Sequence, residues 1–216
     1  MIAVLPAILA KDKQDFEMRL SVLKNHFTKA QIDVVNESII EGHSWAEPED
    51  IESIVGTMKF EVHLMVDLKD YDLEQWNRAW IEKIILHVEN GNILKEKMDL
   101  IKSWNKKVFL AINPDTPLEE LKPFVKKADG VMFMTIDPGR MGNEFRPLVM
   151  DTIREFHDSN PDVELEVDGG ITNDTLPPIL SLGVSTVAVG SYFQNDKIED
   201  HLLEVIPIVE HFEGQK

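Results

Sequence analysis

Short apolar or β-branched runs recur along the chain about every 25 residues, and more polar stretches separate them. Eight such runs occur, at residues 2–5, 31–35, 60–66, 83–88, 108–112, 130–135, 164–167 and 186–189. Some of them, such as residues 131–134, are apolar at every position, which is typical of parallel strands that are covered on both faces. The pattern therefore predicts eight buried, parallel strands.

The stretches between these runs are charged and carry apolar residues at helical spacing. Intervals of three and four residues place such side chains on one face of a helix, where they pack against a sheet. The clearest stripes consist of Phe16, Leu20, Leu23 and Phe27; of Leu94, Met98, Ile101 and Trp104; and of Val149, Ile153 and Phe156. Residues 199–210 predict a last amphipathic helix.

Eight strand-then-helix units in 216 residues predict a single (β/α)8 TIM barrel that forms one domain over residues 1–216. An open, doubly wound sheet is the alternative, because a sequence rhythm does not reveal whether a sheet closes. No Gly-x-Gly-x-x-Gly sequence follows the first strand, and this argues against the open sheet.

The charge balance excludes some classes of partner. The chain has 22 Lys and Arg residues against 39 Asp and Glu residues, a formal net charge of −17. Such an acidic surface argues against nucleic acid or an anionic membrane as a partner. The absence of cysteine excludes disulfides, thiolate metal ligands and a cysteine nucleophile, and it fits the reducing cytoplasm, where we expect this protein.

Polar residues at the ends of predicted strands mark the candidate site, because barrel enzymes carry their chemistry at the carboxyl ends of the strands. Gln31 and Asp33 lie two positions apart and therefore on one face of the second strand. His63 lies in the third strand, and Asp168 ends the seventh. If Asp33, His63 and Asp168 point to one centre, they form a nitrogen and oxygen site for a divalent metal ion.

Glycine turns after three neighbouring strands give a second signal. Glycine lets backbone N–H groups approach an anion closely, and phosphate sites of barrel enzymes commonly lie after strands 7 and 8. The same glycines would also serve as ordinary turns. The candidate phosphate-binding residues are Gly139, Arg140, Met141, Gly142, Gly169, Gly170, Gly190 and Ser191.

These residues carry a resemblance to a known family. Matching strings run in order through the chain at residues 6–10, 32–34, 62–66, 87–89, 111–117, 134–139, 167–171 and 189–191. Ala-Ile-Asn-Pro-Asp-Thr-Pro at 111–117 and His-Leu-Met-Val at 63–66 are the most specific. On these strings the chain resembles the ribulose-phosphate 3-epimerase family, whose fold is a TIM barrel of the ribulose-phosphate-binding type.

The resemblance implies metal-assisted epimerisation at C3 of a ketose phosphate, such as ribulose 5-phosphate to xylulose 5-phosphate. It implies that Asp33 and Asp168 are the two acid/base residues and that both contact one divalent ion (Zn, Fe, Mn or Co) together with His63. Met65 and Met134 match methionines that cover the site, although plain core packing explains them equally well. Members of the family commonly assemble into homo-oligomers, so we expect one here.

Several differences from the family fall in the site. Gln31 replaces a histidine that is usually a metal ligand, which predicts a weak or indirect fourth ligand, and Ala7 replaces a pocket serine. Arg140 replaces an aromatic residue in the segment beside the phosphate, so we expect it to contact either the phosphate or solvent. Three functions remain open: an epimerase of some ketose phosphate, a silent sugar-phosphate-binding paralogue, and another enediolate reaction such as decarboxylation or aldol cleavage.

Overall fold

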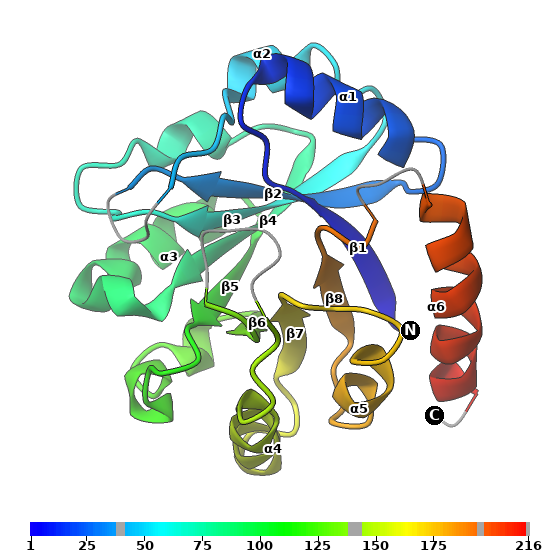
Figure 1. Cartoon of the computed structure of the whole chain (residues 1–216). Helices are drawn as coiled ribbons and strands as arrows, with labels where there is room; N and C mark the ends of the chain where they lie inside the picture. Colours follow the sequence, from blue (N-terminus) through cyan, green and yellow to red (C-terminus); the bar gives the residue numbers. More distant parts are fainter. Residues whose placement is uncertain (38–41, 138–143, 194–196, 215–216) are drawn as a thin grey trace.

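The computed structural model describes residues 1–37, 42–137, 144–193 and 197–214, which form a closed barrel of parallel strands with helices around it (Figure 1). The strands are β1 Ala3–Ile8, β2 Lys29–Val35, β3 Lys59–Met65, β4 Ile81–His87, β5 Lys107–Ile112, β6 Gly130–Met134, β7 Glu164–Asp168 and β8 Thr186–Val189. Each strand pairs with its neighbours in sequence, and β1 pairs with β8. The predicted (β/α)8 TIM barrel is confirmed, and the open sheet is excluded.

The connections are less uniform than the strands. The α-helices are α1 Lys13–Leu23, α2 Pro48–Glu52, α3 Leu94–Ser103, α4 Val149–Ser159, α5 Leu176–Leu180 and α6 Ile198–Glu213. The 3₁₀ helices are η1 Leu73–Trp76, η2 Val88–Ile93, η3 Leu118–Leu121 and η4 Val125–Lys127. The three predicted stripes fall on α1, α3 and α4. Two of them overrun their helices, because Phe27 lies beyond the end of α1 and Trp104 is the capping residue that follows α3.

The first strand is longer than the pattern predicts. The apolar run ends before Pro6, where the missing N–H commonly interrupts a strand. In the structure β1 continues to Ile8: its first four residues pair with β8, with Pro6 opposite Val189, and its end pairs with β2. This extension places Ala7 directly beside Gln31 at the carboxyl end of the barrel.

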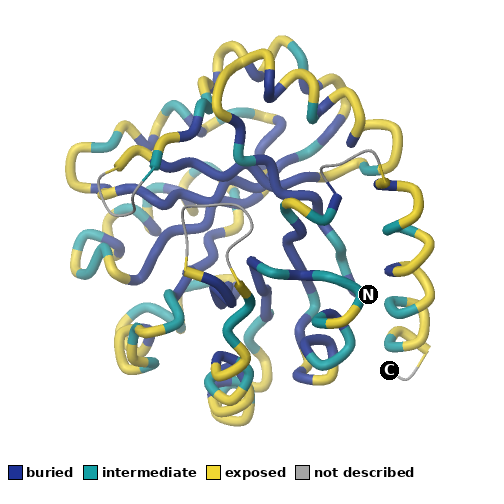
Figure 2. Tube along the Cα trace, in the orientation of Figure 1, coloured by how far each residue is buried: buried dark blue, intermediate teal, exposed yellow. Residues whose placement is uncertain are grey.

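The barrel has two hydrophobic cores because alternate residues of each strand face inward and outward. Outward-facing residues pack under the helices, whose outer surfaces are exposed (Figure 2). Inside the barrel a separate apolar cluster fills the axis, and it consists of Ile85, Phe109, Ala111, Met132, Met134 and Ile136. In the part of the chain that the structure describes, no helix combines the length and the apolar character needed to cross a membrane.

Below this cluster, at the amino ends of the strands, the interior is ionic. The Lys83 ammonium lies 2.7 Å from Glu61 Oε2 and 2.6 Å from Glu166 Oε2, and it stands 4.1 Å above the centre of the Phe109 ring. Burial lowers the pKa of Lys83, but the charges of Glu166 and Glu61 outweigh it and raise the pKa above its ordinary value. Burial together with the charge of Glu166 raises the pKa of Glu61 well above 4.5.

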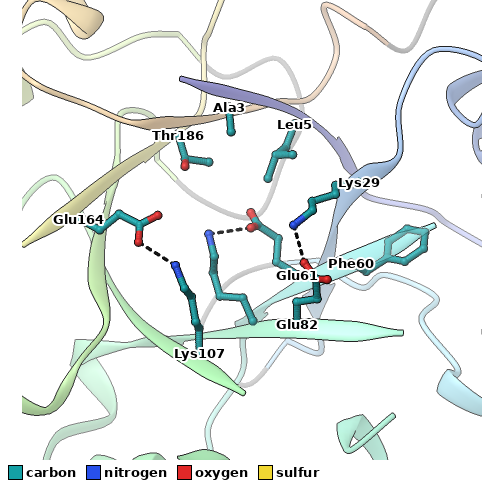
Figure 3. Close-up of a pocket in the computed structure, with 11 residues that line it drawn as sticks. Ala3, Leu5, Lys29, Phe60, Glu61, Glu82, Lys107, Glu164 and Thr186 are labelled. Atoms are coloured by element: carbon teal, nitrogen blue, oxygen red, sulfur yellow. Dashed lines mark hydrogen bonds and ion pairs between the residues drawn. The ribbon is translucent and has the colours of Figure 1, made fainter. Parts of the chain in front are cut away.

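A cavity of about 360 Å³ opens onto this ionic group from the amino end of the barrel. Figure 3 shows Glu61 facing the middle of the cavity, with the pair Lys29–Glu82 on one side and Lys107–Glu164 on the other. The side chains of these outer pairs are about half exposed. The distance from Lys29 Nζ to Glu82 Oε2 is 2.5 Å, and that from Lys107 Nζ to Glu164 Oε2 is 2.9 Å. The amino end is therefore lined by paired charged side chains, which suits a stabilising role.

Candidate active site

The strand register brings three of the predicted site residues together at the carboxyl end of the barrel. Asp33 on β2 lies opposite His63 on β3 in the sheet, and Asp168 ends β7. The Nδ1 atom of His63 lies 3.3 Å from Asp33 Oδ1 and 3.3 Å from Asp168 Oδ2. One potential ligand atom from each residue lies within 4.8 Å of the others. Asp33, His63 and Asp168 therefore form a group that could bind a metal ion.

Gln31 joins this group in an unexpected orientation. Its buried Nε2 donates hydrogen bonds to Asp33 Oδ1 at 2.8 Å and to Asp168 Oδ2 at 2.7 Å. Carboxylates only accept hydrogen bonds, so the amide turns its nitrogen toward them. Its Oε1 is buried and has no hydrogen-bond partner among the described residues. The predicted ligation through this oxygen therefore requires the amide to turn over.

The charged groups of the site shift one another's pKa values. Burial lowers the pKa of His63, but hydrogen bonds with Asp168 and Asp33 and their charges raise it to about 9. Burial and the charge of Asp33 raise the pKa of Asp168. Two carboxylates this close do not ionise independently, since each charge disfavours the other. The two acids thus favour a protonated His63, while burial and the charge of Asp33 favour the neutral form of Asp168.

Two further residues, for which the sequence predicts no role, extend the site. His87, at the end of β4, places its Nε2 2.8 Å from His63 Nε2. Its Nδ1 lies 3.1 Å from Glu89 Oε2. Burial lowers the pKa of His87. Burial raises the pKa of Glu89, but contacts with His87 and Thr116 outweigh it and bring the pKa down to about 2. The string His-Val-Glu at a strand end was the only signal.

The predicted pocket residues lie around the same centre. Ala7, Met65 and Met134 are buried. Ala7 lies beside Gln31, and Met134 lies beside Asp168 in the sheet. Met65 follows His63 by two positions on β3 and therefore shares its face. Their contact with a substrate stays a prediction.

The candidate phosphate residues are only partly described. Gly139, Arg140, Met141 and Gly142 lie outside the described residues. Gly169 and Gly170 adopt φ values of +111° and +62°, and a Cβ atom on Gly169 would lie 2.4 Å from Ile136 Cγ1. The turn alone therefore demands glycine there. Gly190 follows β8 and Ser191 is exposed, so phosphate binding by these residues stays a prediction.

The fold and the site define a class. A closed (β/α)8 barrel with two acids and an imidazole at the carboxyl ends of its strands has the architecture of barrel enzymes. The sequence model of the ribulose-phosphate 3-epimerase family matches residues 3–194, so the chain belongs to this family. No curated protein sequence matches the chain significantly.

Solved structures resemble the fold at low sequence identity. The 3-keto-L-gulonate-6-phosphate decarboxylase from Vibrio cholerae O1 biovar El Tor aligns over 98% of both chains at 12% identity and a TM-score of 0.73. A mutant tryptophan synthase α-subunit from Pyrococcus furiosus aligns over 96% of this chain and 98% of its own at 15% identity and a TM-score of 0.71. A native KDPGal structure aligns over 97% of this chain and 96% of its own at 13% identity and a TM-score of 0.67. These similarities show the fold alone.

Proposed function

We propose that this protein is a metal-dependent 3-epimerase of a phosphorylated ketose, either ribulose 5-phosphate and xylulose 5-phosphate or a related pair. The observation that carries the proposal is the convergence of Asp33 and Asp168 on one buried point, in a member of the ribulose-phosphate 3-epimerase family. Epimerisation needs one group that removes a proton and a second that returns it to the opposite face, and two carboxyls fill these roles.

The side chains fit a divalent ion. Asp33, His63 and Asp168 would hold it with two carboxylate oxygens and one imidazole nitrogen, a set that suits Zn, Fe, Mn or Co. The unpartnered, buried Oε1 of Gln31 would become a fourth ligand, and the third oxygen donor, if the amide turned over. When bound, such an ion stabilises the negative charge that develops on the substrate oxygens.

The protein's own groups move the proton. One of the two aspartates takes the proton from C3, so that the C3–H bond breaks and an enediolate forms. The other carboxyl, protonated at that moment, gives its proton to C3 from the opposite face. The raised pKa of Asp168 suits a carboxyl that holds a proton between steps. The glycines at 169, 170 and 190 and Ser191 are the candidates for holding the phosphate.

One observation favours a second function, a silent sugar-phosphate-binding paralogue. The Gln31 amide already donates hydrogen bonds to both carboxylates, so it occupies oxygen atoms that a metal ion would otherwise bind. Deuterium uptake distinguishes the two functions. The protein is incubated in heavy water with five- and six-carbon ketose phosphates and each candidate metal, and NMR follows the C3 proton.

Exchange that disappears in Asp33→Asn would support the epimerase. Thermal stabilisation by a ketose phosphate without any exchange, across all sugars and metals, would overturn it in favour of the binding protein.

A further inference from the structure

His63 contacts the two aspartates on one side and a second histidine on the other. Its Nε2 lies 2.8 Å from Nε2 of His87, while the ring centres are 5.0 Å apart and the ring planes differ by 14°. The ring planes are nearly parallel, and the contact between the nitrogens spans most of the distance between the ring centres, so the rings meet edge to edge as an N–H···N hydrogen bond requires. Both side chains are fully buried, so one nitrogen must donate and the other must accept.

Glu89 decides the direction of this bond. Its Oε1 accepts from the Asn113 backbone N–H at 2.9 Å and from the Thr116 hydroxyl. Its Oε2 lies 3.1 Å from Nδ1 of His87. Because a carboxylate only accepts, His87 must carry a proton on Nδ1. A neutral His87 then has only a lone pair on Nε2, which must accept from the Nε2–H of His63.

Hydrogen bonds of the Asn90 and Glu89 side chains fix the backbone around these contacts. The Asn90 side chain donates to the carbonyl oxygens of Val66 and His87, each at 3.2 Å, and accepts from the Leu68 N–H at 2.8 Å. The end of β4 is therefore joined to the loop that follows β3. Glu89 in turn joins it to the loop that follows β5 through Asn113. The segment that carries His87 and Glu89 is therefore fixed to both neighbouring loops.

We propose that His87 and Glu89 are positioning residues that keep a proton on Nε2 of His63 and so direct its Nδ1 toward Asp33 and Asp168. A proton on the wrong nitrogen of His87 would place two N–H groups against each other at 2.8 Å. Partners of this kind orient a metal-binding histidine and raise its basicity. That consequence for metal binding rests on the proposed function, whereas the tautomer of His87 does not.

The first experiment needs neither substrate nor metal. Histidine ring nitrogens of the 15N-labelled, metal-free protein are assigned by NMR at neutral pH, with His87→Phe to identify the signals. We expect His87 to carry its single proton on Nδ1. A proton on Nε2 of His87, or on both nitrogens, would overturn the proposal. Glu89→Gln should remove this exclusive preference, because an amide offers a donor as well as an acceptor. Thr116→Val is the control that keeps the carboxylate and should keep the tautomer.

The second experiment measures zinc affinity by titration against a competing chelator. Glu89→Gln and His87→Phe should each weaken zinc binding by about 10- to 100-fold, the usual effect of losing such a partner. His87→Gln supplies an amide oxygen as acceptor and should recover most of the affinity. Zinc affinities equal to wild type in both Glu89→Gln and His87→Phe would overturn the positioning role.

The two experiments separate this proposal from the proposed function. If the wild-type protein binds no zinc while His87 shows the expected tautomer, the metal-dependent function fails and the positioning of His63 stands. If zinc binds tightly but His87 carries its proton on Nε2, the positioning role fails and the metal site stands.

Discussion

At the scale of single residues, Gln31 bears most directly on metal binding. Its amide hydrogens are directed at both acidic side chains of the site, so a metal ion must displace them before it gains an oxygen ligand. We predict that Gln31→His binds zinc more tightly than the wild type, by at least about tenfold, because an imidazole nitrogen is a good zinc ligand. Competitive chelator titration measures the difference. Equal affinity would show that residue 31 does not reach the ion.

The two aspartates allow a direct test of the proton transfer. Asp33→Asn and Asp168→Asn should each slow C3 exchange by at least about 100-fold, since each removes a positioned acid or base. NMR of deuterium uptake into the ketose phosphate measures this rate. Glu82→Gln, at the half-exposed mouth of the opposite end, is the control and should leave the rate unchanged. Near-normal exchange in either aspartate variant contradicts the two-carboxyl mechanism.

At the scale of the elements, Glu89 links the end of β4 to the loop after β5, and the stability of this link depends on pH. The pKa of Glu89 is about 2 in the folded protein and lies below the usual 4.5. The contribution of Glu89 to stability is therefore complete above pH 4.5 and is lost as the pH falls toward 2. Glu89 is partly open to solvent, which screens its interactions, so between pH 6 and pH 3 the wild type should lose about 1 kcal/mol more unfolding free energy than Glu89→Gln.

Urea unfolding of the metal-free proteins at both pH values measures this difference. Glu74→Gln changes an exposed glutamate and should follow the wild type. If the wild type and Glu89→Gln lose the same unfolding free energy between the two pH values, the contacts of Glu89 do not contribute to the pH dependence of stability.

The ionic group at the amino end joins β3, β4 and β7 through one lysine. Lys83→Met should destabilise the barrel by about 3–5 kcal/mol, because Glu61 and Glu166 are buried and would lose their cation. Lys107→Met is the matched control: it breaks a half-exposed pair with Glu164 and should cost less than about 1 kcal/mol. Urea unfolding at neutral pH compares them. A Lys83→Met protein as stable as Lys107→Met would show that the buried carboxyls find other compensation.

The strands could be predicted from the sequence because they are buried on both faces and stand out as apolar runs. Asp33 and Asp168 could be predicted because acids at strand ends are conspicuous. The rest depends on partners that are distant in sequence: Lys83 and Glu166 meet only across the closed barrel, and the proton positions on His87 follow from Glu89. The orientation of the Gln31 amide likewise depends on Asp168, which lies 137 residues away.

At the scale of the whole molecule, metal binding should raise the free energy of unfolding and the Tm. Zinc at 100 times its dissociation constant should stabilise the fold by about 2.7 kcal/mol. For a chain of this size that corresponds to a rise in Tm of roughly 5–10 °C. Thermal melts with zinc and with a chelator measure the rise, and Asp168→Asn should abolish it. The same rise in wild type and Asp168→Asn would place the zinc elsewhere.

The apolar layer inside the barrel also has a consequence for protein engineering. Ile85, Phe109 and Met132 lie between the ionic group and the acidic site, and Lys83 and His87 are four residues, or about 13 Å, apart along β4. Substitutions at such distances usually have additive effects. Lys83 can therefore be varied for heat resistance in one set of variants and the acidic site in another, and the two sets can be combined afterwards, whereas Glu61 and Glu166 lie only two positions from His63 and Asp168 and would have to be varied together with the site.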